Sequence, residues 1–394
     1  MSPRVLFYVQ HLLGVGHVKR AAAISRAMLA GGLDVTVALG GEPVPLAEFG
    51  AAKVRQLPPV RARDQSFQML VDEDGREIDE GWWARRRKAL LGIDAELKPD
   101  VLLVEHFPFG RRKFRAELLP LFEACKDRTV IACSVRDVLV DKGDAAKQAK
   151  IVALARRWFA AILVHGDPDV IPFGATFRQA DRIADLLRYT GYIADPPGGK
   201  SGRGSWGADD GGSGGVVVST GGGAVGAKLL EAALAARLEG TLADCHWRLL
   251  AGRNLAPEVL ADLCRRAPEN VTVEWARADF PTLLAKAGLS ISQGGYNTLM
   301  DILIAGCPAI VVPFAAGEES EQAFRAKRFA GRGLLRVLDE NALNEEALTR
   351  LASETYCAEP DAPSVRAAPG INLDGAAQTA EMVRELAGTS RGGR

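Results

Sequence analysis

The stretch from Leu289 to Gly331 brings together residue types that can hold a phosphate and a sugar hydroxyl. An apolar run ends at Gly294-Gly295, and helical spacing follows from Tyr296 to Ala305. Backbone N–H groups at a helix start bind anions, and glycines let a phosphate approach closely. Thr298 adds a hydroxyl, whereas Asp301, on the same helical face, repels phosphate and suits a ribose diol. The pattern predicts a nucleotide site, and an ordinary strand–helix–strand unit with a solvent-facing Asp301 is the alternative.

A second set of polar residues follows the next predicted strand, Ala309 to Phe314. Glu321 and Gln322 come after a turn-rich acidic segment, and their side chains supply hydrogen-bond acceptors and donors. They suit the hydroxyl groups of whatever the nucleotide carries. Asn297, in the first turn of the preceding helix, is a further candidate on the nucleotide side.

A histidine and a glutamate lie at the ends of two other predicted strands. His17 begins a helix after the strand Arg4–Gln10 and the turn Gly14-Val15-Gly16, where open α/β sheets bind their ligands. The helix N-terminus should keep this imidazole neutral, as a general base must be. Glu105 ends the strand Asp100–Glu105 and is the second candidate for the base. A structural capping role is the alternative for His17.

Positively charged residues gather at two further places. Arg111, Arg112 and Lys113 stand at the start of a helix, where cations are unfavourable unless an anion is bound. His106 is expected to support the same loop. The run Arg85–Lys88 lies beside two tryptophans in a predicted helix, and it suits a membrane interface, a clamp for an anion, or simply a solvated basic face.

A glycine-rich turn, Thr220 to Ala227, follows the predicted strand Val216–Ser219. Its glycines fit the dinucleotide pattern G-x-G-x-x-G. That fingerprint also requires an acidic residue at the end of the next strand, and Ala251-Gly252-Arg253-Asn254 stands there instead. NAD is therefore disfavoured, and NADP bound through Arg253 remains an alternative.

The length of 394 residues predicts two domains, and alternating apolar runs and helical spacing predict an α/β fold with parallel sheets. The expected boundaries are an N-terminal domain 1–194, a linker 195–215 rich in Gly, Pro and Ser, and a C-terminal domain 216–394.

The charge balance excludes a strong overall field, because 49 basic residues stand against 49 acidic ones. We therefore expect no nucleic-acid partner. Six scattered cysteines form no close Cys/His set, so neither a zinc site nor a disulfide framework is expected. No apolar run approaches transmembrane length and no signal peptide precedes the first strand, which favours a cytoplasmic protein.

The segment 289–331 resembles the donor-binding part of the MurG-like glycosyltransferases, glycosyltransferase family 28 with the GT-B fold. By position, Asp301 matches the family's ribose-binding carboxylate, Gly295 and Thr298 its phosphate turn, and Glu321-Gln322 its sugar-contacting pair. Gly16-His17 matches the family's N-terminal glycine turn and its histidine, which is proposed to sit between donor and acceptor.

The same resemblance implies the remaining site residues and the architecture. It implies two Rossmann-like domains facing a cleft, with the last helix, residues 374–386, crossing back onto the first domain. Trp275 would stack on uracil or belong to the core. The implied donor-binding set is Gly14, Gly16, Gly222, Gly223, Arg253, Trp275, Gly294, Gly295, Asn297, Thr298, Asp301, Glu321 and Gln322. The implied acceptor-side set is His106, Arg111 and Arg112.

In function, the resemblance implies inverting, metal-independent transfer of a hexose or N-acetylhexosamine from a UDP-sugar. The acceptor, a glycan, a lipid-linked group or a small molecule, is not identified, and no cofactor is expected. The basic segments leave open a peripheral contact at the inner face of the plasma membrane. The alternatives are a UDP-sugar 2-epimerase on the same fold and a non-catalytic nucleotide-sugar-binding protein.

Overall fold

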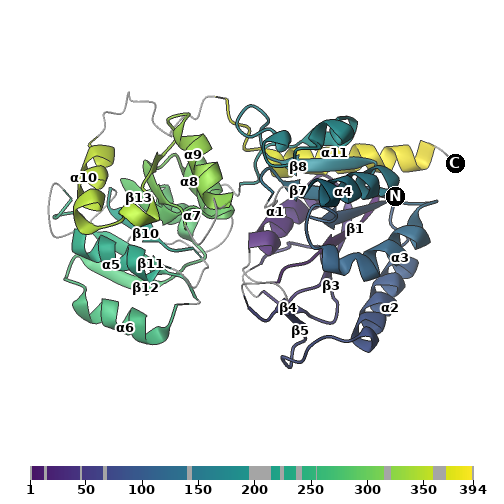
Figure 1. Cartoon of the computed structure of the whole chain (residues 1–394), viewed down its shortest axis with the longest axis horizontal. Helices are drawn as coiled ribbons and strands as arrows, with labels where there is room; N and C mark the ends of the chain where they lie inside the picture. Colours follow the sequence, from purple (N-terminus) through teal and green to yellow (C-terminus); the bar gives the residue numbers. More distant parts are fainter. Residues whose placement is uncertain are drawn as a thin grey trace. The chain divides into compact units, whose positions relative to one another are not determined.

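The chain folds into two compact units, each built around a parallel sheet (Figure 1). The first unit contains Met1–Ile193 together with Asn372–Arg394, and the second contains Ala194–Ile371. The computed structural model describes residues 2–12, 16–44, 47–64, 69–139, 144–194, 214–221, 226–236, 242–253, 255–314, 321–357 and 370–392.

In the first unit, the described strands form one parallel sheet of seven strands in the order β3-β2-β1-β6-β7-β8-β9. The central strands are almost wholly buried, which is why they are continuous apolar runs in the sequence. A short hairpin pairs β4 with β5. The strands are β1 (Arg4–Val9), β2 (Asp34–Leu39), β3 (Lys53–Gln56), β4 (Arg61–Ala62), β5 (Leu70–Val71), β6 (Val101–Glu105), β7 (Val130–Arg136), β8 (Ala161–His165) and β9 (Leu187–Tyr189).

Helices cover both faces of this sheet. On one face, α2, α3 and α4 share a core with side chains such as Leu102 and Val104. On the other face, α1 and α11 share a core with Phe7 and Val9. The helical segments are α1 (Gly16–Ala30), α2 (Glu80–Leu97), η1 (Arg112–Phe114), α3 (Arg115–Cys125), α4 (Ala145–Trp158), η2 (Phe173–Ala175), η3 (Ala180–Leu186) and α11 (Gly375–Gly392).

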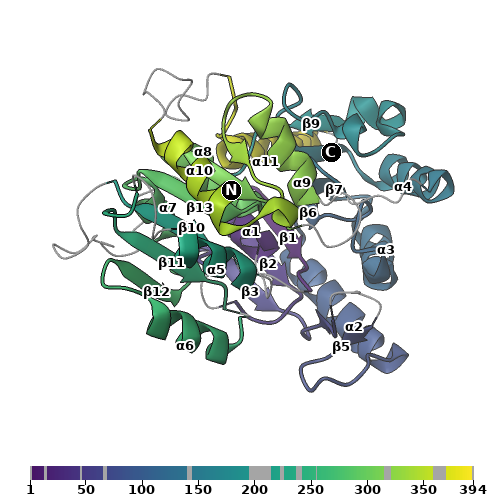
Figure 2. The same ribbon diagram turned by 60° about the vertical axis from the view of Figure 1, so that its left-hand side comes forward.

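Helix α11 belongs to the first unit although it ends the chain, and it is drawn in yellow in Figures 1 and 2. Val383 and Ala387 bury in the same core as Ile24 of α1. A Cβ on Gly375 would lie 2.6 Å from the Tyr192 carbonyl oxygen, so only glycine allows this close approach. The first unit thus includes the last residues of the chain. This agrees with the expectation that residues 374–386 cross back onto the first domain. The predicted C-terminal domain, 216–394, ends at residue 371 in the structure, because the apolar stripe of α11 completes the first core.

The second unit has a parallel sheet of six described strands in the order β12-β11-β10-β13-β14-β15. Helices α5, α6 and α10 share one core with this sheet, and α7 packs against α8. The strands are β10 (Val216–Ser219), β11 (Trp247–Ala251), β12 (Val271–Trp275), β13 (Leu289–Gln293), β14 (Ala309–Val312) and β15 (Arg336–Val337). The helical segments are α5 (Ala227–Ala236), α6 (Pro257–Arg266), α7 (Phe280–Leu284), α8 (Tyr296–Ala305), α9 (Glu321–Ala330), η4 (Glu340–Ala342) and α10 (Glu345–Tyr356).

Each sheet has one point at which the strand order reverses. In the first unit, β1 lies between β2 and β6, and in the second, β10 lies between β11 and β13. Chain segments that leave the carboxyl ends of two such strands diverge, and open α/β sheets bind ligands in the crevice between them. Most of the predicted site residues lie on segments that leave β1 and β6 in one unit and β10 and β13 in the other, whereas Arg253, Trp275 and the pair Glu321-Gln322 lie at or after β11, β12 and β14.

The basic run on α2 divides between surface and core. Arg85 and Lys88 are exposed, whereas Arg86 is fully buried. The interpretation of the whole run as a solvated basic face is therefore wrong at Arg86, which lies on the same side of α2 as buried Trp82 and Leu90.

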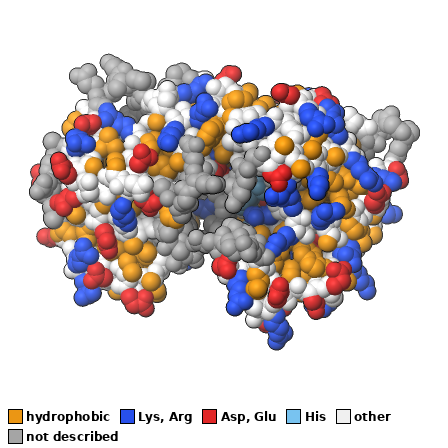
Figure 3. Space-filling view, viewed as in Figure 1, with side chains coloured by type: hydrophobic (Ala, Val, Ile, Leu, Met, Phe, Trp, Pro, Cys, Tyr) orange, Lys and Arg blue, Asp and Glu red, His pale blue; other side chains and the backbone are white. Residues whose placement is uncertain are grey.

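The visible surface carries charges of both signs. On the face drawn in Figure 3, Lys and Arg side chains are interspersed with Asp and Glu over each unit. Among the described residues, no helix combines the length and the apolar character that crossing a membrane requires.

Candidate functional site

His17 and Glu105 meet where the strand order of the first sheet reverses. His17 lies in the first turn of α1, which follows β1, and Glu105 is the last residue of β6. His17 Nδ1 lies 2.6 Å from Glu105 Oε1, and the two side chains expose 14% and 1% of their surface. When the carboxylate accepts the Nδ1 proton, Nε2 keeps its lone pair for another partner. The sequence offered these residues as alternative bases, and the structure joins them into one pair.

Arg20 is a third member of this group that the sequence analysis missed. Its Nη2 donates to the same Glu105 Oε1 at 2.5 Å and lies 3.2 Å from His17 Nδ1. Its side chain is only 3% exposed. A signal was present in the sequence, because Arg20 is a cation one helical turn after His17 within the mostly apolar face that α1 buries.

The surroundings keep His17 neutral and Glu105 ionised at neutral pH. Burial lowers the pKa of His17 from its ordinary 6.5 to about 4, although Glu105 acts in the opposite direction. The predicted lowering is confirmed, but burial rather than the helix N-terminus is its main cause. Burial alone would raise the pKa of Glu105, but the interaction with His17, including its hydrogen bond, and the charge of Arg20 hold it well below the ordinary value.

The loop after Glu105 brings two residues of the predicted acceptor side near His17. His106 and Arg111 have φ of 69° and 54°, a left-handed conformation that is uncommon outside glycine and often found at functional sites. The His106 and His17 ring centroids lie 5.8 Å apart. The charge of Arg111 acts to lower the pKa of both histidines. Arg112 is exposed, so the structure brings only the first arginine of the predicted acceptor-side set towards the pair.

In the second unit, two glycine-containing turns approach Thr298. Gly295 is the N-cap of α8, and a glycine cannot cap the first N–H groups with a side chain. A Cβ on Gly295 would lie 3.7 Å from Thr298 Oγ1, and a Cβ on Gly221, which follows β10, would lie 3.8 Å from the same atom. Gly221 and Gly295 thus lie close to the same hydroxyl group, as expected if the two glycine turns converge. The predicted site residues Gly14, Gly222 and Gly223 lie outside the described residues.

Helix α8 has the bounds that the sequence predicted, and it presents two polar side chains on one face. Asn297 and Asp301 are four residues apart and both are half-buried. Thr298 is nearly buried, with 9% of its surface exposed. An anion held at the helix start would place a neighbouring hydroxyl group within reach of Asp301, about one turn further along the helix.

Glu321 and Gln322 begin α9, and the structure shows contacts for both side chains. Glu321 Oε1 accepts a hydrogen bond at 3.0 Å from Nη2 of Arg325, which is fully buried. The Arg325 guanidinium also stacks 5.0 Å from the ring centroid of Tyr296, the first residue of α8. Gln322 Oε1 accepts from the Phe314 backbone N–H at 3.2 Å. The pairing of Glu321 with a buried cation was not visible in the sequence.

The last two predicted donor-side residues, Arg253 and Trp275, lie at or just after the ends of two neighbouring strands, β11 and β12. Arg253 is exposed in the turn after β11, and Gly252 N donates to Thr220 Oγ1 at 2.8 Å, which ties that turn to the first glycine turn. Trp275 ends β12 and packs partly against the core of the unit while remaining half-buried.

The described residues contain no group of three or more His, Cys, Asp or Glu that could hold a metal ion.

Comparison with known proteins identifies the second unit. Residues 216–366 match the glycosyltransferase family 28 C-terminal domain. The match covers most of the second unit. A curated relative, UDP-N-acetylglucosamine--N-acetylmuramyl-(pentapeptide) pyrophosphoryl-undecaprenol N-acetylglucosamine transferase of Clostridium novyi (strain NT), is 31% identical over 87 residues, which are 22% of this chain and 24% of the relative. The chain therefore matches only about a quarter of that relative's length.

Solved structures resemble the whole chain and confirm the GT-B fold. The calicheamicin glycosyltransferase CalG4 aligns with a TM-score of 0.62 at 17% identity, over 99% of this chain and 98% of that one. Acinetobacter baumannii MurG aligns with a TM-score of 0.57 at 13% identity, over 99% of this chain and 100% of that one. The MurG-like resemblance and the predicted fold class are thus confirmed.

Proposed function

We propose that the protein is an inverting glycosyltransferase that moves a hexose or N-acetylhexosamine from a UDP-sugar to a hydroxyl group of an acceptor. The observation that carries this proposal is the His17–Glu105 pair, joined at 2.6 Å at the strand reversal of one unit, in a chain whose other unit is a family 28 domain. A neutral histidine oriented by a carboxylate is a suitable general base for a sugar-acceptor hydroxyl.

In the proposed reaction, His17 Nε2 removes the acceptor proton while Glu105 holds Nδ1–H and stabilises the imidazolium that forms. The acceptor oxygen then attacks the anomeric carbon. The bond from that carbon to the diphosphate oxygen breaks, and UDP leaves with the electron pair. Because attack comes from the side opposite the leaving group, the anomeric configuration inverts.

In the second unit, the start of α8 is proposed to bind the donor diphosphate. The N–H groups behind Gly294-Gly295 and the hydroxyl of Thr298 would face the negative charge that develops on the leaving group. Asp301 would accept hydrogen bonds from the ribose hydroxyls. UDP-N-acetylglucosamine is the first donor to test, since the family 28 relative named above carries it in its name.

The alternative functions find less support in the site. A UDP-sugar 2-epimerase would need carboxylates near the anomeric carbon, and Glu321 is already paired with Arg325. The other candidates for that role, Glu318 and Glu319, lie outside the described residues. NADP binding through Arg253 would require the same turn to hold a dinucleotide, and the family match favours a nucleotide-sugar instead.

Calorimetric binding of UDP, UDP-N-acetylglucosamine, GDP and NADP tests the proposal. We expect UDP to bind, and Asp301→Ala to weaken binding by about 1–3 kcal/mol, the cost of leaving a hydroxyl pair without its acceptor. Asp262→Ala is the matched control, because Asp262 is an acidic residue on α6 that pairs with Arg265 and Arg266. Binding of NADP alone, with no dependence on Asp301, would contradict the proposal.

We also propose where in the cell the protein acts. A cytoplasmic enzyme with peripheral contact at the inner face of the plasma membrane fits the exposed cations Arg85, Lys88 and Arg112. Sedimentation with vesicles containing anionic lipid, compared with neutral vesicles, tests this location directly.

A further inference from the structure

A positively charged side chain lies inside the core of the first unit. Arg86, in the middle of α2, has no exposed surface, and neither has Glu117, which accepts from Arg86 Nε at 2.7 Å. Moving two charges out of water is costly, and an apolar pair of similar volume often stabilises a fold equally well or better. Stability alone therefore does not account for this pair, and the contacts of Arg86 show which segments it holds in place.

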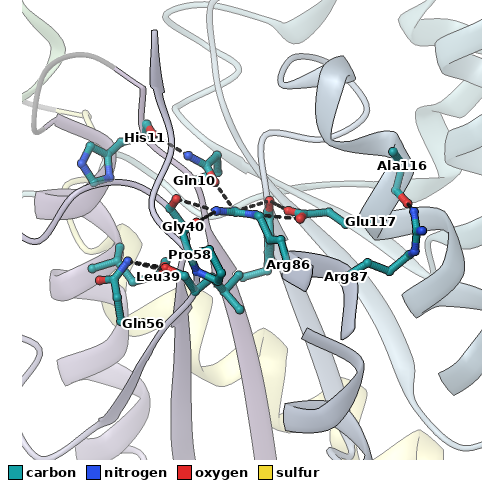
Figure 4. A network of polar contacts seen from close by, with 12 residues as sticks. Gln10, His11, Leu39, Gly40, Gln56, Pro58, Arg86, Arg87, Ala116 and Glu117 are labelled. Carbon is teal, nitrogen blue, oxygen red and sulfur yellow. Dashed lines mark hydrogen bonds and ion pairs between the residues drawn. The ribbon is translucent and has the colours of Figure 1, made fainter. Parts of the chain in front are cut away.

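Every N–H group of Arg86 has an acceptor, and the acceptors come from different segments (Figure 4). Nη1 donates to the carbonyl oxygens of Gly40 at 2.7 Å and Pro58 at 2.6 Å. Nη2 donates to Gln10 Oε1 at 2.5 Å and to the Tyr8 hydroxyl at 3.4 Å. A Cβ on Gly40 would collide with Gln10 Oε1 and Arg86 Nη2, so a side chain at this position would displace both groups.

Gln10 connects this buried cation to both sides of the His17–Glu105 pair. Its side-chain Nε2 donates to the His11 carbonyl oxygen at 2.6 Å, on the segment that leads from β1 to α1. Its backbone oxygen accepts from Arg111 Nε at 3.0 Å, on the loop that follows Glu105. Because Arg86 and the His11 carbonyl oxygen hold the two ends of the Gln10 side-chain amide, they also hold the backbone of Gln10, whose oxygen accepts from Arg111.

From these contacts we infer that Arg86 is a positioning residue that acts through Gln10 to set the geometry of the His17–Glu105 pair. It touches neither residue. Through Gln10 it holds the segment at the end of β1, including the backbone oxygen that accepts from Arg111. The positive charge of Arg111 is one of the charges that lower the pKa of His17. The inference depends on the proposed function only in one respect, namely that the His17–Glu105 pair serves as the general base.

Nitrogen NMR of the histidine side chains tests this inference without any substrate. The chain has five histidines, so single substitutions assign each signal. We expect the wild-type His17 to be neutral with its proton on Nδ1. Arg86→Lys keeps the charge but cannot make five hydrogen bonds, and Gln10→Met removes both side-chain amide contacts while keeping the backbone oxygen that accepts from Arg111. In both variants the backbone at residue 10 is no longer held in place, so we expect its contact with Arg111 to loosen. The pKa of His17 should then rise by about one unit, since a nearby positive charge disfavours the imidazolium.

Arg87→Met is the matched control. Arg87 is the next residue of α2, and its contacts are with the Ala116 carbonyl oxygen and Glu80, outside the network (Figure 4). Its His17 signals should match the wild type, and the buried His165 should be unchanged in all three variants. A His17 titration identical to the wild type in folded Arg86→Lys and Gln10→Met, with only the melting temperature lowered, would overturn the inference.

Two other outcomes can be distinguished from a failure of this inference. If Arg86→Lys does not fold, Gln10→Met alone decides, because it leaves the Arg86–Glu117 pair in place. If the wild type binds no UDP, the proposed function fails, but the NMR comparison still decides whether Arg86 positions His17.

Discussion

His17 Nδ1 and Glu105 Oε1 lie 2.6 Å apart although the two residues are 88 positions apart in the chain. The contact exists because β1 and β6 are neighbours in the sheet, in parallel register from Val5 opposite Val101 to Tyr8 opposite Val104. The two strands therefore end side by side, and the residues that follow them meet at one edge. Arg20 completes the group from the second turn of α1.

We expect His17→Ala to reduce kcat by about 10²–10⁴-fold, the usual contribution of a general base. Binding of UDP should be unchanged, because His17 lies in the first unit and the proposed nucleotide site in the second. UDP release from UDP-N-acetylglucosamine and calorimetry measure the two effects. His246→Gln is the control, since His246 bonds to Thr272 away from the site. Equal losses in both variants would exclude His17 as the base.

The pH dependence of kcat/KM should show an acidic limb near pH 4 rather than 6.5. The active form has a neutral His17, and burial lowers its pKa to about 4. Activity should therefore be level from about pH 5 to neutrality and fall tenfold per pH unit below the pKa. A profile of initial rates at subsaturating donor measures this limb. A limb at the ordinary histidine value would mean that another histidine, or a solvated His17, acts as the base.

Removal of metal ions should leave the activity unchanged if the start of α8 alone stabilises the leaving diphosphate. We expect the same rate of UDP release with EDTA as with added Mg²⁺ or Mn²⁺. Loss of activity in EDTA, restored by one of these ions, would show that a cation shares the diphosphate charge.

Two glycine substitutions should have opposite effects on the free energy of unfolding. A Cβ on Gly226 would collide with the Thr220 side chain, so Gly226→Ala should destabilise the protein by about 1–3 kcal/mol. Gly92 lies inside α2 with nothing within 4 Å of the added Cβ, so Gly92→Ala should stabilise it by about 0.4–1 kcal/mol. Urea unfolding of each variant measures the difference. Equal effects would mean that the turn at Gly226 can move away from Thr220.

The sequence by itself determined the local elements and the positions of the main chemical groups. The helix at Tyr296–Ala305 has the predicted bounds, and Gly306 ends it with φ of 64°. His17 and Glu105 were predicted at strand ends, and the structure has them there. These features depend on hydrophobic spacing and on the backbone freedom of glycine, which act between residues near one another in the chain.

Only the tertiary structure decided which of these groups meet. Spacing does not show that β6 pairs with β1, that Arg20 shares the Glu105 carboxylate, or that Glu321 is paired with Arg325. The sequence pattern does not distinguish Arg86 from the exposed cations around it, although Arg86 occupies the buried stripe of α2. The burial of a charge depends on partners from distant segments, and strand order decides which segments those are. For the same reason, the place of α11 followed from the core it completes rather than from its position in the chain.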